Sequence, residues 1–200
     1  MELSHVVRRR HMVRSFDVRS VADDVLQRVL EAATRAPAAG NTQALDLLVL
    51  RGPDETGRYW DATLAPEKRP AFRWPGLLRA PVLVLPCVRA DAYLERYGED
   101  DKRRTGLGAG RDRWAVPYWH VDGGMATMLV LLAAEDEGLG ALFFGIFEHE
   151  PAVRQAFGIP DDVQPLGTIA LGHPTGDDEP GRSTSRGRRP LEEVVHRGTW

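Results

Sequence analysis

The sequence has one cysteine, no long apolar run and no excess of positive charge. A single thiol excludes an internal disulfide, and Cys87 lies in the apolar stretch 81–88, so we expect a buried, unreactive thiol rather than a nucleophile. The longest apolar run, 125–134, is far shorter than the roughly 20 residues of a membrane-spanning helix. The N-terminus also lacks the apolar core of a signal peptide. We therefore expect a cytoplasmic protein without a membrane partner.

The formal charge of −3 leaves the molecule without a general basic field for nucleic acid or an anionic membrane. Any anion must therefore be bound by a local cluster of basic residues. The length of 200 residues, with 42% hydrophobic and 28% charged residues, fits one globular domain with a complete core. We predict a single domain over residues 1–200.

Apolar spacing predicts a chain of mixed helices and strands. A helical stripe from Val21 to Ala33 follows Ser20, which we expect to be the N-cap, with Asp23 completing a pair that resembles a capping box. Further helices are predicted at 120–137, apolar on nearly all sides and ended by Gly138, and at 151–157, closed by Gly158. A helix buried on most sides needs cover from several directions, so a second subunit is a hypothesis for part of that cover.

Short apolar segments predict the strands. They lie at 44–50, 81–88, 142–147 and 166–172, with a terminal strand at 191–196. The first two contain few polar residues, which is typical of central strands rather than half-exposed edges. The polar stretches between these elements are expected to carry short helices and loops.

Basic side chains gather just before the first predicted helix. They are Arg8, Arg9, Arg10, His11 and Arg14. The planar guanidinium of arginine donates two parallel hydrogen bonds to phosphate oxygens, so this cluster can hold a phosphate. A solvated basic tail is the alternative.

A turn of small residues with two carboxamides occupies 36–43. Small side chains allow a flat ligand to approach the backbone, and the amides of Asn41 and Gln43 can hydrogen-bond to the edge of a heterocycle, such as the pyrimidine end of a flavin. An ordinary helix-to-strand turn explains the same residues.

Three other motifs point more weakly to chemistry. Glycines at 106–110 follow a charged stretch rather than a strand, so a lid is favoured over a dinucleotide-binding loop. Residues 147–150 offer possible metal ligands, but helix capping and solvation explain them better. The aromatic residues at 114–120 either cover a site by stacking or pack against the predicted long helix.

Four segments together resemble the flavin-dependent nitroreductase family. They are Arg-Arg-His-x-x-Arg-x-Phe at 9–16, Ala-Pro-x-x-Gly-Asn-x-Gln at 36–43, Gly-Leu-Gly-Ala-Leu-Phe-Phe-Gly at 138–145, and the closing segment 186–196. These segments follow the family's order and spacing over almost the whole chain, whereas 51–117 matches poorly.

The resemblance implies an α+β fold, with a mostly antiparallel central sheet flanked by helices and an intertwined homodimer that holds FMN at its interface. The single domain would carry a variable insert or lid at about 51–117 and a C-terminal arm at about 173–200. On the phosphate and ribityl side the implied residues are Arg10, His11, Met12, Arg14, Arg186 and Arg188. On the isoalloxazine they are Pro37, Ala38, Ala39, Asn41 and Gln43 from one chain and Phe144, Gly145 and Ile146 from the other. A backbone N–H near Gly145 would face flavin N5.

Two positions depart from the family pattern. Met12 stands where a serine usually contacts the phosphate, and Ala44-Leu45 replaces a frequent proline and aromatic pair. A neutral hydrogen bond contributes roughly 0.5–1.5 kcal/mol, so loss of the hydroxyl weakens FMN binding by up to about tenfold.

The residues show no clear nucleophile, catalytic dyad or metal site, which agrees with chemistry carried by a flavin. We therefore expect an oxidoreductase that takes hydride from NADH or NADPH and passes it to a planar acceptor, such as a nitroaromatic or quinone, by a ping-pong mechanism. Arg14 is expected near the pyrimidine end, where its charge favours the reduced anionic flavin. A flavin-binding protein for sensing or storage, and an enzyme that uses reduced flavin with oxygen for biosynthesis, are the alternatives.

Overall fold

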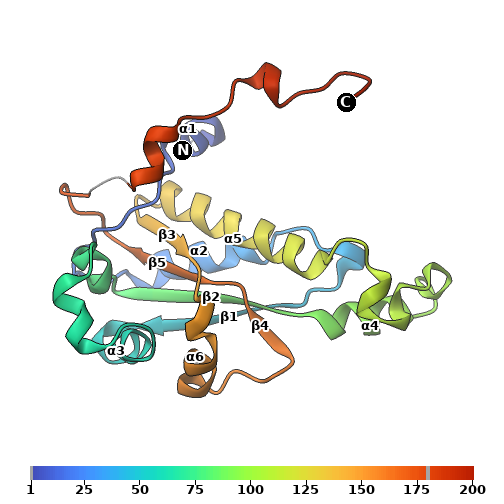
Figure 1. The fold of residues 1–200 in the computed structure, drawn as a ribbon, viewed down its shortest axis with the longest axis horizontal. Helices are drawn as coiled ribbons and strands as arrows, with labels where there is room; N and C mark the ends of the chain where they lie inside the picture. The colour runs from blue at the N-terminus through green and yellow to red at the C-terminus, as the bar shows by residue number, and fades with distance from the viewer. Residues whose placement is uncertain (1, 179–180) are drawn as a thin grey trace.

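A five-stranded sheet organises the chain in the computed structural model, which describes residues 2–178 and 181–200 (Figure 1). Its order is β1 (Leu45–Arg51), β2 (Val82–Arg89), β5 (Thr168–Gly172) and β3 (Gly140–Phe144), and β4 (Val163–Pro165) pairs with the end of β2. The ladders that join these strands are antiparallel. The predicted α+β fold with a mostly antiparallel sheet is confirmed.

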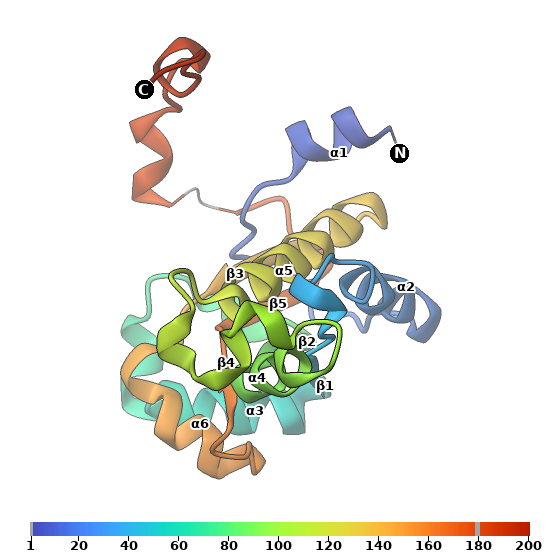
Figure 2. The same cartoon turned by 90° about the vertical axis from the view of Figure 1, so that its right-hand side faces the viewer.

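Helices cover both faces of the sheet. They are α1 (Leu3–Arg9), α2 (Asp23–Ala33), α3 (Gly52–Thr63), α4 (Ala90–Gly98), α5 (Tyr118–Asp136) and α6 (Glu150–Phe157). Figure 2 shows α2 and α5 together on one face, with α3 and α6 together on the other. Short 3-10 turns fill much of the chain between these elements.

Strand β2 separates the two halves of the core. Its side chains alternate between faces, so Val82 and Val84 join the apolar cluster under α2 and α5. Leu83 and Leu85 join the opposite cluster, which includes Tyr59 of α3. Every β2 residue before Arg89 is buried, as expected of a central strand.

Two of the sequence predictions about these elements were wrong, and two elements were not predicted. Helix α2 begins at Asp23 with Ala22 at its N-cap and no side-chain cap, because Ser20 lies too far before the first turn. Strand β1 is an edge strand, half-exposed over most of its length, although its composition indicated a central one. Two elements were missed, since α1 contains part of the basic cluster and β4 is only three residues long.

The C-terminal arm, residues 181–200, extends away from the rest of the chain beyond α1 (Figures 1 and 2). Residues 184–200 are all exposed. The predicted terminal strand at 191–196 is wrong, because the chain forms a 3-10 turn at Leu191–Glu193 and then continues irregularly. A strand needs a neighbouring edge for its backbone hydrogen bonds, and the arm has none beside it within this chain's described residues.

Helix α5 ends at Asp136, and Gly138 follows with a φ of 73°, as its pattern predicted. Val130 and Ala134 are fully buried, whereas Val121, Met125 and Met128 are 37–40% exposed. The helix is therefore apolar on a face that the chain itself leaves open.

The weaker motifs have structural roles. Residues 106–110 form tight turns against α4, where Gly108 approaches the backbone of Gly98. Trp114 and Trp119 pack on Tyr93, so these two rings pack inside the chain and do not cover an open site.

Among the described residues, no group of histidine, cysteine and acidic side chains is arranged to hold a metal ion. Within the same residues, no helix has the length and apolar character needed to cross a bilayer.

Candidate functional site

The two ends of the chain meet around one cavity, which we call the basic cradle. Arg10, His11, Met12 and Arg14 border this space of about 660 Å³, and Arg188 of the C-terminal arm borders it as well. Arg188, almost 180 positions further along the chain, therefore completes the basic cluster predicted at the N-terminus.

Arg10 is the member of the cradle that lacks an acceptor. Its Nη1 atom is shielded from solvent and has no hydrogen-bond partner among the described residues. His11 is exposed, and its Nδ1 donates to the Arg9 carbonyl oxygen at 3.0 Å. A buried guanidinium N–H without an acceptor is destabilising. An anion with several oxygens, such as a phosphate, would supply that acceptor.

Arg14 stands between the basic cradle and a second cavity. Its Nη1 donates to the Met12 carbonyl oxygen at 2.9 Å, and its guanidinium carbon lies 5.4 Å from the centre of the Trp74 ring. Its backbone N–H donates to Asp178 Oδ1 at 2.6 Å. These contacts fix the direction of the guanidinium, which borders both cavities.

Met12 replaces the serine that is usual in the resembling family, and the structure shows what the side chain does. It packs against the apolar clusters on both faces of the sheet, and its backbone forms a parallel bridge with Ala141 of β3. Met12 therefore anchors the basic cradle to the core, while its carbonyl oxygen orients Arg14.

Arg186 is placed differently from Arg188. It ends the short turn at Arg182–Arg186, is exposed, and is not among the described residues that line the basic cradle. Within this chain, only Arg188 of the two predicted arm arginines joins the N-terminal cluster.

The second cavity is aromatic and has a volume of about 510 Å³. It is lined by the predicted Phe144, Gly145 and Ile146, by Arg14, and by further aromatic residues: Tyr59, Trp60, Phe72, Trp74, Phe143 and Phe147. The rings of Trp60 and Phe144 stack with centroids 6.0 Å apart and planes 6° apart. This cavity suits a flat, apolar ligand with a polar edge toward Arg14.

Gly145 and Phe147 have an unusual arrangement at the mouth of the aromatic cavity. A Cβ on Gly145 would lie 2.6 Å from the Phe147 ring, so a larger residue there would have to displace that ring. Phe147 is 82% exposed and has a φ of 50°, which is strained for a side chain of this kind. An exposed aromatic ring on a strained backbone is typical of a ligand-contacting position.

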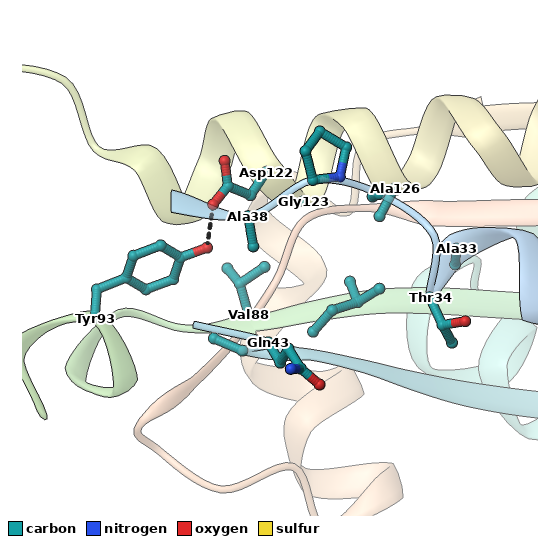
Figure 3. A pocket seen from close by; sticks show the side chains of 13 residues that line it. Ala33, Thr34, Ala38, Gln43, Val88, Tyr93, Asp122, Gly123 and Ala126 are labelled. Carbon is teal, nitrogen blue, oxygen red and sulfur yellow. Dashed lines mark hydrogen bonds between the residues drawn. The ribbon is translucent and has the colours of Figure 1, made fainter. Parts of the chain in front are cut away.

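A third, smaller cavity of about 170 Å³ lies beneath the turn at 36–43 (Figure 3). Pro37, Ala38 and Gln43 line it, whereas Asn41 is exposed outside it. Ala39 does not line it, but its backbone N–H donates to the Asp122 carboxylate at 2.7 Å. The turn is thus held in place from below, and both carboxamide residues are exposed, although Gln43 also borders the cavity.

The predicted site residues form two separate groups within one chain. The basic cradle and the aromatic cavity share Arg14, whereas the cavity under the turn shares no lining residue with either. The family resemblance implies that the turn at 36–43 comes from one subunit of a homodimer and Phe144, Gly145 and Ile146 from the other, and this arrangement stays a prediction.

Several residues at these cavities were not expected from the sequence. Trp60 and Trp74 come from the stretch that matched the family poorly, and Asp178 lies in a loop with few patterned residues. Asp122 and Tyr93 line the cavity under the turn. Asp122 did carry a signal, because it is a lone acid in the apolar first half of α5.

An α+β fold with a basic cradle beside an aromatic cavity defines a class of protein suited to hold a planar ligand with an anionic group. The nitroreductase family model matches residues 7–173 of this chain. The chain therefore belongs to the nitroreductase family of oxidoreductases.

Individual relatives agree with this assignment. A protein of Archaeoglobus fulgidus with the provisional name NADH dehydrogenase/NAD(P)H nitroreductase is 26% identical over 195 residues, covering 96% of this chain and 94% of its own. The FMN reductase [NAD(P)H] of Bacillus subtilis is 26% identical over 94% of this chain and 70% of its own.

Solved structures share the fold. A nitroreductase family protein of Streptococcus pneumoniae matches with a TM-score of 0.73, 21% identity, and 98% and 100% of the two chains covered. A provisionally named nitroreductase of Desulfovibrio desulfuricans, crystallised with FMN, matches with a TM-score of 0.69, 23% identity, and 100% and 98% covered.

Proposed function

We propose that the protein is an FMN-dependent oxidoreductase that uses NADH or NADPH to reduce a planar acceptor, such as a nitroaromatic or a quinone, by a ping-pong mechanism. One observation carries the proposal: Arg10, Arg14 and Arg188 border one cavity, and Arg10 has a buried N–H without an acceptor. A phosphate on a flat cofactor matches both the charge and the unused donor.

The residues of this chain fit FMN in distinct ways. Arg10, His11 and Arg188 would hold the phosphate, and Arg14 would place positive charge between the phosphate and the ring. Phe144, Gly145 and Ile146 would lie against the isoalloxazine, whose close approach needs the bare Gly145 backbone. Bound FMN would supply the hydride chemistry. The sequence shows no clear nucleophile that would carry a different reaction.

The complete site is proposed to form in an intertwined homodimer. Supporting this, α5 exposes apolar side chains, and the C-terminal arm exposes Leu191, Val194 and Trp200 by 55–101%. Exposed apolar side chains of this number mark surfaces that a partner covers. A second subunit would cover it and bring the turn at 36–43 toward the partner's aromatic cavity.

Acceptor selection is proposed to lie in residues 51–117. This segment contributes Tyr59, Trp60, Phe72 and Trp74 to the aromatic cavity, and these four rings favour planar aromatic acceptors by stacking. The cytoplasmic location expected from the sequence also stays a prediction, which cell fractionation would test.

The first test is the visible absorption spectrum of the purified protein, with chromatography of the cofactor released on denaturation. Stoichiometric FMN would support the proposal. A colourless protein that takes up no added FMN would contradict it.

Turnover separates the enzyme from a flavin-binding sensor or storage protein. We expect steady oxidation of NADH or NADPH with a quinone under anaerobic conditions, and parallel lines in double-reciprocal plots, as a ping-pong reaction requires. Bound FMN without turnover would favour the binding protein. Turnover that needs oxygen and forms a specific product would favour the biosynthetic alternative.

A further inference from the structure

Asp122 joins three elements beneath the turn at 36–43. It projects from α5, is 7% exposed, and its Oδ2 accepts hydrogen bonds from the Ala39 N–H at 2.7 Å and the Tyr93 hydroxyl at 2.8 Å. Figure 3 shows Tyr93 of α4 reaching the carboxylate across the cavity. The acid therefore ties the turn to both α4 and α5.

The charge on Asp122 is not balanced by a neighbouring cation. None of the ion pairs found among the described residues includes this carboxylate. Burying an unpaired carboxylate is costly, and a neutral acceptor would hold the same two donors at lower cost. Burial, with a contribution from Asp122, also raises the pKa of the Tyr93 hydroxyl, so Tyr93 stays a donor. A structural role alone does not explain why this position is charged.

The turn above Asp122 is held in a conformation that its residues would not adopt freely. Asn41 has a φ of 54° and Gln43 a φ of 52°, both in the left-handed region. Besides Asp122 at Ala39, Arg96 Nε donates to the Gly40 carbonyl oxygen at 2.8 Å. These anchors on consecutive residues fix the backbone just before the two carboxamides.

We propose that Asp122 is a positioning residue for the flavin: it anchors Ala39 so that Asn41 and Gln43 face the ring edge, and its negative charge lowers the reduction potential of the bound cofactor. This inference rests on the proposed FMN function. The potential falls because a fixed negative charge destabilises the negatively charged reduced ring by Coulomb repulsion.

The test compares three single variants of the full-length protein. Asp122→Asn keeps the size and one acceptor oxygen but removes the charge. Tyr93→Phe removes one donor and keeps the carboxylate on Ala39. Thr56→Val is the control, because its buried hydroxyl also makes one hydrogen bond, to the Gly52 carbonyl oxygen at 2.9 Å, and Thr56 lines none of the three cavities.

We expect Asp122→Asn to raise the Kd for FMN about tenfold, as loss of one charged hydrogen bond implies, and to raise the flavin reduction potential. Tyr93→Phe should raise the Kd about threefold with little change in potential, because the charge remains. Thr56→Val should leave FMN affinity and potential at wild-type values, whatever its effect on the melting temperature.

Each result decides between distinct conclusions. Wild-type FMN binding with an unchanged potential in Asp122→Asn would overturn the inference and leave the proposed function standing. If Asp122→Asn does not fold, Tyr93→Phe decides, and equal FMN affinities for Tyr93→Phe and Thr56→Val would overturn the inference. A wild-type protein that takes up no FMN would overturn the proposed function and this inference with it.

Discussion

The backbone N–H of Arg14 donates a hydrogen bond of 2.6 Å to Oδ1 of Asp178. The next residues add to this connection, since Ser15 Oγ donates to Asp177 at 3.0 Å and the Thr175 N–H donates to the Ser15 carbonyl oxygen at 3.1 Å. Hydrogen bonds from Thr175 and Ser15 hold the pKa of Asp177 below its ordinary value. The segment before the C-terminal arm is therefore fastened to the basic cradle on the side where the arm begins.

Asp178 also places a negative charge in the cavity proposed for a phosphate. We expect Asp178→Asn, which keeps an acceptor for Arg14, to tighten FMN binding by about threefold, because it removes a repulsion of about 0.5–1 kcal/mol. Titrations at low and high salt would check this, since screening should shrink the gain. Weaker binding at both salt concentrations would show that the anchoring role of the carboxylate dominates.

Arg10 should contribute to phosphate binding specifically. Arg10→Ala is expected to raise the Kd for FMN by roughly 10–100-fold, which corresponds to the 1.5–3 kcal/mol of a charged hydrogen bond. Riboflavin has no phosphate, so its Kd should not change. Arg9→Ala is the matched control, because Arg9 pairs with Glu135 at 3.0 Å and does not line the cavity. An equal loss for both flavins would contradict a phosphate role for Arg10.

Arg14 borders the aromatic cavity, where its charge should favour electron uptake by a bound flavin. We expect Arg14→Gln to lower the two-electron potential by about 30 mV, equivalent to about 1.4 kcal/mol. Arg79→Gln serves as the control, because Arg79 bonds to Phe16 and Ser15 and does not line that cavity. An unchanged potential in Arg14→Gln would refute the proposed placement of this charge.

The open face of α5 should be a subunit contact. Met125 and Met128 are 37% and 40% exposed, and we expect the double change to glutamate to shift the protein toward monomers and to reduce bound FMN. Sedimentation velocity across a concentration series would measure this. Val18→Glu changes a 74% exposed side chain outside α5 and should leave the assembly intact. A monomeric wild type would refute the dimer.

Alkaline pH should destabilise the fold through Tyr59. Burial raises the pKa of this tyrosine to about 12 from 10.0, although its hydrogen bond with Thr168 acts in the opposite direction. Because the folded pKa is raised, the stabilisation is complete below about pH 10 and is lost as the pH rises toward 12. It amounts to roughly 2–3 kcal/mol at most. Urea unfolding between pH 9 and 11 should show a steeper loss for wild type than for Tyr59→Phe.

Patterning predicted the elements whose environment lies within the chain. The uninterrupted apolar run of β2 reflects its burial on both faces, and the apolar residues of α5 such as Val130 and Ala134 are buried within the chain. The failures have a common physical origin. β1 is apolar although it is an edge strand, and residues 191–196 have a strand-like pattern although they have no sheet edge to join. The sequence therefore indicates the surroundings that a residue prefers, but not which chain provides them.

The candidate site could be predicted in part for a similar reason. The arginines and the turn carry local signals that do not depend on partners distant in sequence, and the structure brings Arg10, Arg14 and Arg188 together. Asp122 and Tyr93 acquire their roles only by meeting 29 positions apart across a cavity. Their relation to Ala39 depends on how α4, α5 and the turn pack, which no local pattern encodes.

Cys87 lies near the end of β2, opposite Asp46 of β1 and Pro165 of β4, and is 3% exposed. The buried thiol expected from the sequence is confirmed, and burial raises its pKa to about 11, while its lack of reactivity stays a prediction. A thiol reagent can therefore react only when the strands around Cys87 separate. Because the chain has no other cysteine, the labelling rate under native conditions reports the population of the open state, and at reagent concentrations where labelling outpaces closing it reports the opening rate. Cys87 is thus a natural probe of sheet opening, and no cysteine has to be introduced for the measurement.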